Sequence, residues 1–275
     1  SLDRWLEDRM YYRVGADLTF EPYPPDQGTG TVTGPEGVGP DAEPASGVWI
    51  PLPYEFLRLP GVVAATRVGD YPLEIRVGTG DEVSGRFLAV DRLDFPSVAW
   101  FRRDLAQEPL GALMNDLALS PENVLVPRQF MDQYRLQIGD KVRLSVTVSP
   151  GVRINEVFTV IGTFDHFPTA YEEVTIVGNL ERLSDILGLP PRHSIWLRTK
   201  EGTEGQAVFN AVPRTMGVEV GKPMDARALI REEQAKTERV GVFGTLSIGF
   251  LAAVAMAGMG LLLYSYASLR ERLYS

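Results

Sequence analysis

The feature that most constrains this chain is a run of thirty residues without a charged side chain, at positions 240–269. A helix needs about 20 mainly apolar residues to cross a hydrocarbon core about 30 Å thick. The alternative is a buried helix of a globular protein, but such helices seldom stay uncharged on every face over this length. The run follows a long segment and therefore cannot be a signal peptide. The sequence predicts a transmembrane helix at 240–267, preceded by a domain at 1–239.

Charge and composition limit the kinds of partner and site that this domain can have. The chain has a net charge of −9, and positions 1–239 hold 25 basic against 35 acidic residues, a balance of −10. Binding nucleic acid draws on clustered lysine and arginine, so we expect no nucleic-acid partner. The chain has no cysteine, which excludes disulfides and thiolate metal sites. It begins without methionine and stops soon after the uncharged run, so we expect it to be a piece of a longer polypeptide.

The flanks of the uncharged run indicate its orientation. Arg270 and Arg272 follow it directly, and positive charges at the end of a transmembrane helix favour the cytoplasmic side. The opposite flank also carries Arg231, Lys236 and Arg239, mixed with glutamates, so the difference is small. We expect residues 1–239 to be extracytoplasmic and residues 268–275 to begin a cytosolic segment.

Hydrophobic periodicity predicts a mixture of strands and helices. The expected strands are 17–21, 62–68, 73–77, 87–90, 123–126, 174–177, 194–199, 218–220 and a hairpin of 141–148 with 154–164. The expected helices are 1–14, 97–104, 110–117, 128–134, 180–187, 206–216 and 225–239, the last continuing into the membrane. Residues 22–47 are rich in proline and glycine and indicate a long loop. This order favours an α+β fold, in one large lobe or two, over a doubly wound sheet.

The sequence contains no catalytic constellation. HExxH, CxxC and GxSxG motifs are absent, and the two histidines, His166 and His193, are expected to be hydrogen-bonded locally. The aromatic cluster of Phe95, Trp100 and Phe101 is expected to pack a helix against the sheet rather than to form a binding surface. We therefore expect no enzyme activity in this chain, no metal site and no cofactor.

Within the uncharged run, small residues recur every four positions. They are Gly241, Thr245, Gly249, Ala253 and Ala257. Such a stripe lets a second helix approach closely, which is the usual mode of helix packing in lipid. We expect these five residues to contact another transmembrane helix.

Several short motifs resemble one known family when taken in order. They are Tyr12-Arg13-Val14-Gly15-Ala16-Asp17, Asn123-Val124-Leu125-Val126-Pro127, Leu136-Gln137-Ile138-Gly139-Asp140-Lys141-Val142, Phe158-Thr159-Val160-Ile161-Gly162 and Glu238-Arg239-Val240-Gly241-Val242-Phe243-Gly244. With the following span and Ser268-Leu269-Arg270-Glu271-Arg272, they resemble the extracytoplasmic domain and second transmembrane helix of MacB/FtsX-type ABC transporter permeases. Residues 22–47 match no feature of that family.

The resemblance implies a permease fragment in a bacterial cell membrane. It implies a cytosolic ABC ATPase subunit, further permease helices or a second permease copy, and the lipid bilayer as partners. Proteins of this kind export lipoproteins, lipids or peptides, or regulate cell-wall hydrolases, by mechanical transmission. The alternative is a single-pass receptor or sensor with an extracellular ligand-binding domain.

Overall fold

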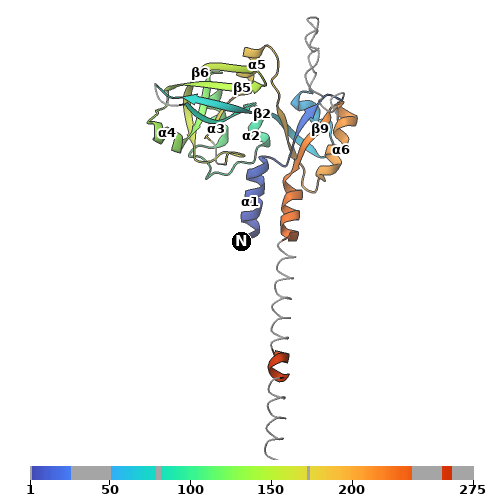
Figure 1. The fold of residues 1–275 in the computed structure, drawn as a ribbon. Helices are drawn as coiled ribbons and strands as arrows, with labels where there is room; N and C mark the ends of the chain where they lie inside the picture. Colours follow the sequence, from blue (N-terminus) through green and yellow to red (C-terminus); the bar gives the residue numbers. More distant parts are fainter. Residues whose placement is uncertain (1, 26–50, 79–81, 172–173, 237–255, 262–275) are drawn as a thin grey trace, which may run out of the picture. The chain divides into compact units, whose positions relative to one another are not determined.

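The computed structural model describes residues 2–25, 51–78, 82–171, 174–236 and 256–261 (Figure 1). The chain divides into two compact units, Ser1–Arg227 and Ala228–Ser275. The first unit mixes helices and strands, as an α+β fold should, and holds all nine strands of the described part in a single sheet. In the second unit, the described residues 228–236 and 256–261 are helical. Among the described residues, no helix is long and apolar enough to cross a membrane.

Six strands of the sheet close into a barrel. They are β2 (Val62–Arg76), β3 (Glu82–Val90), β7 (Val174–Asn179), β4 (Asn123–Pro127), β6 (Val152–Phe164) and β5 (Lys141–Ser149), in that order. The ring closes because β2 pairs with both β3 and β5. Two of its pairings, β3 with β7 and β4 with β6, are parallel. The predicted hairpin is confirmed as β5 and β6, which pair antiparallel.

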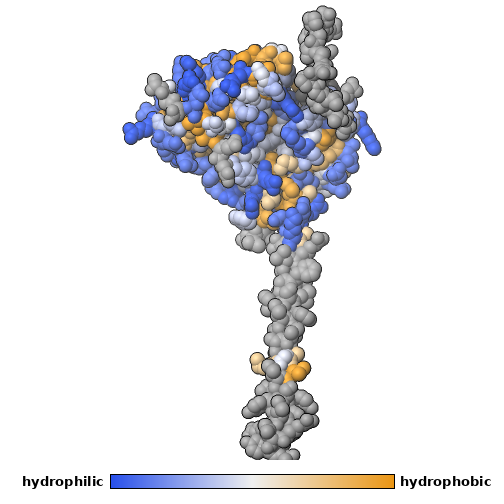
Figure 2. All heavy atoms as spheres, in the orientation of Figure 1, coloured by the Kyte–Doolittle hydropathy of each residue, from blue (hydrophilic) through white to orange (hydrophobic). Residues whose placement is uncertain are grey.

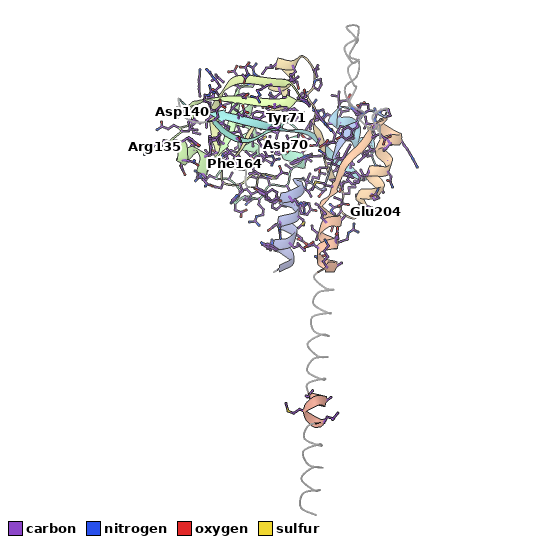
Figure 3. The ribbon with its side chains drawn as sticks, in the orientation of Figure 1. Asp70, Tyr71, Arg135, Asp140, Phe164 and Glu204 are labelled. Atoms are coloured by element: carbon purple, nitrogen blue, oxygen red, sulfur yellow. The ribbon has the colours of Figure 1, made fainter. Side chains whose placement is uncertain are left out.

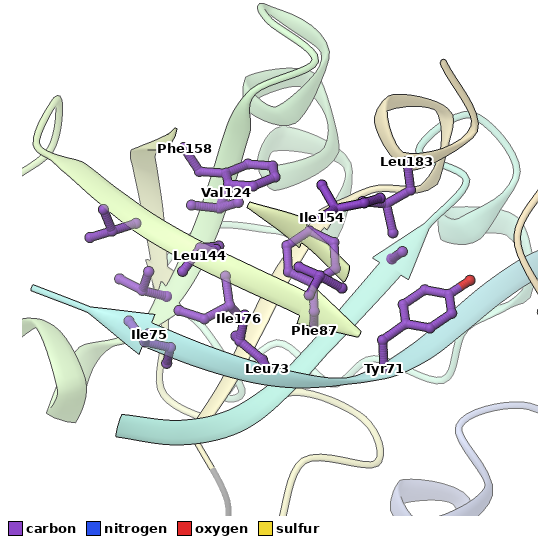
Figure 4. Close-up of a cluster of buried hydrophobic side chains, with 14 of the residues drawn as sticks. Tyr71, Leu73, Ile75, Phe87, Val124, Leu144, Ile154, Phe158, Ile176 and Leu183 are labelled. Atoms are coloured by element: carbon purple, nitrogen blue, oxygen red, sulfur yellow. The ribbon is translucent and has the colours of Figure 1, made fainter. Parts of the chain in front are cut away.

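The interior of the barrel is filled by apolar side chains (Figure 4). On β5 the strict alternation of the sequence puts Val142, Leu144, Val146 and Val148 inward. Phe87 of β3 and Phe158 of β6 are fully buried, with ring centroids 5.5 Å apart. Helices α4 (Arg128–Tyr134) and α5 (Leu180–Leu187) add side chains to the same cluster. The barrel is therefore a packed core and not a channel.

The other strands extend the sheet from the first half of β2. Strand β8 (Ser194–Thr199) pairs with β2, β1 (Leu18–Tyr23) pairs with β8, and β9 (Glu219–Asp225) forms the outer edge. Helix α6 (Gly205–Met216) and the 3-10 helix η2 (Pro53–Arg58) pack on this part. A third cluster of buried side chains joins α2 (Phe95–Val98) and α3 (Leu110–Ala118) to the outside of the barrel.

One predicted break in the sheet is wrong. Residues 62–68 and 73–77 were expected to be two strands, but β2 runs without interruption from Val62 to Arg76. Gly69 lies inside this strand and makes no turn, because residues 69–72 are paired with β3, Gly69 with Ala89 and Pro72 with Arg86. This long strand belongs to both the barrel and the outer part of the sheet, so it joins the two rigidly.

One predicted helix is also wrong. Residues 97–104 were expected to be helical, but α2 ends at Val98 and the chain continues without helix. The N–H of Trp100 donates to the carbonyl of Gly15 at 2.7 Å, so this N–H is used in a long-range contact. The helix at the start of the chain is confirmed as α1 (Leu2–Val14), and the last helix begins at Ala226 as expected. Most of the predicted loop at 22–47 lies outside the described residues.

Candidate functional site

Most residues of the predicted helix-packing stripe lie outside the described part of the chain. Gly241, Thr245, Gly249 and Ala253 are among them, as are Arg270 and Arg272 on the predicted cytosolic flank. Ala257 lies in the short described helix at 256–261, where it is exposed. The prediction that this stripe contacts another helix therefore stays a prediction.

A groove of about 730 Å³ lies beside the first half of β2. Five large apolar side chains with exposed surface line it: Leu52, Tyr54, Leu57, Val63 and Leu93. They come from the η2 region, from β2 and from the segment that follows β3. Figure 2 shows both hydrophilic and hydrophobic side chains on the face that it draws. The five residues named here gather around a single groove. Exposed apolar patches of this kind commonly mark binding surfaces.

The charged groups of this groove are largely paired with one another. Arg67 donates to Asp91 at 2.7 Å, and Arg92 lies 3.6 Å from Glu181. Burial raises the pKa of Asp94, and the nearby negative charge of Asp91 adds to the effect. Because opposite charges are matched within the walls, the groove suits an apolar partner with few charges of its own.

A smaller hollow of about 410 Å³ is lined by residues of β1, β2, β5, β8 and β9, and it contains several charged groups. Glu21 accepts hydrogen bonds from Lys222 at 2.7 Å and from Arg192 at 2.9 Å. Burial opposes the ionisation of Glu21, but the hydrogen bonds from Lys222 and from Tyr23 outweigh it and hold its pKa below the ordinary value. Glu21 pairs with both cations, and Asp70 is a second carboxylate of the lining, so this hollow has little excess charge to offer a ligand.

Tyr71, labelled in Figure 3, also lines this hollow. Its hydroxyl donates to the carbonyl of Arg192 at 2.6 Å. Burial raises the pKa of Tyr71 far above the ordinary value, and the charge of Asp70 adds to this. The Tyr71 hydroxyl is therefore a neutral hydrogen-bond donor that connects β2 to the segment before β8. It cannot serve as a base near neutral pH.

His193 behaves as expected from the sequence. His193 is buried, and its Nδ1 lies 2.8 Å from the carbonyl of Pro191, two residues away. His166 is exposed. No group of three or more potential metal ligands occurs among the residues that the structure describes. The predicted packing role of the aromatic cluster is confirmed for Phe95, which is fully buried and stacks on Phe167 with centroids 5.7 Å apart.

The last candidate is a set of contacts that we call the Asp17 clamp, formed by Asp17, Thr199, Lys200, Ala226 and Arg227. The Asp17 carboxylate accepts from the backbone N–H of Thr199 at 2.7 Å and from its hydroxyl at 3.3 Å. The Asp17 carbonyl accepts from the N–H of Ala226 at 3.0 Å. Arg227 lies 3.5 Å from the Asp17 carboxylate and donates to the carbonyl of Lys200 at 3.0 Å. The clamp thus joins the start of β1, the end of β8 and the start of the last helix.

Helix α1 is tied to the same place. Tyr11 forms a side-chain hydrogen bond with Arg227. Burial alone would lower the pKa of Arg227, but this hydrogen bond and the charge of Asp17 outweigh it and raise the pKa. Asp17 belongs to the sequence motif at 12–17, yet nothing local indicated its partner, which lies 210 positions away. A charged pair at such a distance leaves no periodic signal in a single sequence.

Comparisons with known proteins find distant structural similarities alone. No family model matches the chain, and neither does any curated protein. The fold is similar to the periplasmic region of MacB from Actinobacillus actinomycetemcomitans, with 11% identity and a TM-score of 0.48 over 80% of this chain and 94% of that one. It is also similar to the extracellular domain of the noncanonic ABC-type transporter YknZ from Gram-positive bacteria, with 11% identity and a TM-score of 0.40 over 79% and 95%. At 11% identity and with TM-scores below 0.5, these similarities assign no family to the chain and no role to any residue.

Proposed function

We propose that this chain is the extracytoplasmic domain and following transmembrane helix of an ABC transporter permease of the MacB/FtsX type. The observation that carries the proposal is the Asp17 clamp. It holds the first residues of the last helix, Ala226 and Arg227, against two strands of the sheet by backbone and charged hydrogen bonds. A helix fixed in this way can pass a movement to the domain, whereas a flexible linker would dissipate it.

The proposed cycle divides the work between two sides of the membrane. A separate cytosolic ATPase subunit hydrolyses ATP, so this chain is not itself an enzyme. The resulting movement of the helix at 240–267 reaches the extracytoplasmic domain through residues 226–239 and the clamp. There, β1 and β8 take up the movement, and the long strand β2 connects β8 to the barrel. The cargo belongs to the classes that the resemblance implies, namely lipoproteins, lipids, peptides or a regulated cell-wall hydrolase.

Two experiments test this function in the whole membrane protein. A tagged form should capture a cytosolic ATPase from membranes solubilised in mild detergent. Val240→Pro should then uncouple ATP hydrolysis from cargo movement, because proline removes one hydrogen bond of the helix and kinks it. Val240→Ala, which removes the side chain but keeps the helix, is the matched control and should stay coupled. Normal coupling in the proline variant would refute transmission through this helix.

The second candidate function, a single-pass receptor or sensor, is favoured by one observation. The groove beside β2 concentrates exposed apolar side chains, as a ligand-binding surface would. The capture experiment separates the two functions, since a receptor needs no ABC ATPase. If no ATPase associates, the receptor becomes the better account of the same structure.

A further inference from the structure

Helix α1 presents an aromatic and basic row to its surroundings. Trp5, Arg9 and Arg13 follow one another at four-residue spacing, which aligns them along one side of the helix. The Trp5 side chain is 58% exposed, and the Arg9 guanidinium lies 5.2 Å from the centre of its ring. Both arginines are exposed as well. Leu6, Met10 and Val14, each one position further along, are buried about 100° round the helix, so the row lies outside the side that packs on the core.

The two arginines of this row have no acidic partner in the part of the chain that the structure describes. The nearest acidic residue on the helix, Asp8, is taken by Arg102. Glu7 lies off the row at helical spacing. Many of the other arginines in this acidic domain are paired with carboxylates, so the row is a local excess of positive charge.

A further aromatic side chain extends the row beyond α1. Tyr171 is 59% exposed, and its ring meets that of Tyr12 edge to face at 5.3 Å. Burial raises the pKa of Tyr171, while the charges of Arg13 and Arg9 act in the opposite direction. Both guanidiniums therefore lie close enough to Tyr171 for their charges to act on its hydroxyl. The surface combines two exposed aromatic rings with two unpaired guanidiniums.

We propose that the row of Trp5, Arg9, Arg13 and Tyr171 binds the anionic headgroups of membrane phospholipids. Guanidinium groups form paired hydrogen bonds with phosphate, and tryptophan and tyrosine are enriched at the level of lipid headgroups. The domain as a whole has a net charge of −10, so an anionic membrane surface repels it. A basic row therefore decides which face of the domain can approach that surface. The inference rests on the proposed function, because it requires the membrane anchor at 240–267.

The lengths of the chain permit this contact. The Asp17 clamp brings the residue after the end of β9, Ala226, within hydrogen-bond distance of Asp17, three residues after α1 ends. The 13 residues of α1 extend about 20 Å at about 1.5 Å per residue. Only 14 positions separate Ala226 from the predicted start of the span at Val240, so a short length of chain connects this end of the domain to the predicted membrane anchor.

The test uses the full chain in lipid nanodiscs that contain a phosphatidylcholine with a nitroxide on its headgroup. Quenching of tryptophan fluorescence is measured for the chain and for Trp5→Phe, and the difference isolates Trp5. We expect strong quenching of Trp5 when about a third of the lipid is phosphatidylglycerol and weak quenching in pure phosphatidylcholine. Arg9→Gln with Arg13→Gln should lower the equilibrium constant for docking about 25-fold, at about fivefold for each basic residue. High salt should act in the same direction.

The matched control is Arg135→Gln with Arg214→Gln, which removes one exposed arginine at the end of α4 and one in α6. This variant loses the same charge and should keep the quenching of Trp5. Quenching of Trp5 that depends neither on lipid charge nor on Arg9 and Arg13 would overturn the inference. A chain that fails to co-purify with the nanodiscs would instead refute the membrane anchor, and with it the proposed function.

Discussion

The Asp17 clamp yields a prediction whose size follows from its distances. Asp17→Ala removes the acceptor of the Thr199 N–H bond, which at 2.7 Å is the shortest bond of the clamp. Thr199 is only 7% exposed, so the N–H is left without a partner in a mostly dry position. A hydrogen bond to a charged group contributes about 1.5–3 kcal/mol, and a buried donor left unpaired costs a similar amount. We expect the free energy of unfolding to fall by about 3 kcal/mol.

Substitutions at the same place separate the contributions. Asp17→Asn keeps one oxygen acceptor and should cost about 1 kcal/mol. The contact between Arg227 and Asp17 is 3.5 Å long and Arg227 is partly exposed, so Arg227→Gln should also cost about 1 kcal/mol or less. As a control, Glu74→Gln breaks an exposed ion pair with Arg153 and should cost less than about 0.5 kcal/mol.

The measurement is urea unfolding of the chain in detergent micelles, followed by tryptophan fluorescence, which reports the buried Trp196. The expected order of destabilisation is Asp17→Ala, then Asp17→Asn and Arg227→Gln, then Glu74→Gln. If Arg227→Gln destabilised the domain as much as Asp17→Ala, the ion pair would be the dominant contact and our assignment to the Thr199 N–H would be refuted.

Three further predictions concern the packing and the pH response. Gly15→Ala should destabilise the domain by at least about 2 kcal/mol in the same assay, because its φ is +88° and a Cβ would lie 2.2 Å from the Trp196 ring. Phe158→Ala should cost about 3–5 kcal/mol by opening a cavity in the barrel, and a loss below about 1 kcal/mol would contradict the closed, packed interior. Burial lowers the pKa of His193, so the unfolded chain binds its proton more readily. The stabilising contribution of His193 should therefore be fully present above about pH 6.5 and decline as the pH falls below it. His193→Gln should flatten this dependence of the unfolding free energy on pH between pH 5 and 8. An unchanged slope would show that the histidine titrates normally in the folded chain.

Local patterns in the sequence predicted many of the elements correctly. The helices α4 and α5 and the strand β8 have the predicted boundaries, and the β5–β6 hairpin follows the alternation of apolar residues. These features depend on neighbours within a few positions, so a single sequence contains the information. The errors at residues 69–72 and 97–104 share one cause. In both places a contact with a distant segment, the pairing with β3 or the hydrogen bond to the Gly15 carbonyl, decides the backbone conformation.

The candidate sites divide in the same way. The small-residue stripe at 241–257 and the arginines at 270 and 272 are periodic or flanking signals, which a sequence displays directly. The groove beside β2 and the Asp17 clamp combine residues from segments far apart in the chain. Whether an exposed leucine lines a hollow depends on the side chains opposite to it, which no spacing reveals.

By itself, the sequence determined that an acidic α+β domain precedes a long uncharged segment, because charge and apolar periodicity are properties of the chain alone. Only the tertiary structure decided that six of the strands close into a barrel and that β2 links this barrel to the outer sheet. It alone brought Asp17 to Thr199 and Arg227. The physical reason is that strand pairing and burial are settled by contacts between distant segments. These contacts are stable only when the whole core packs together.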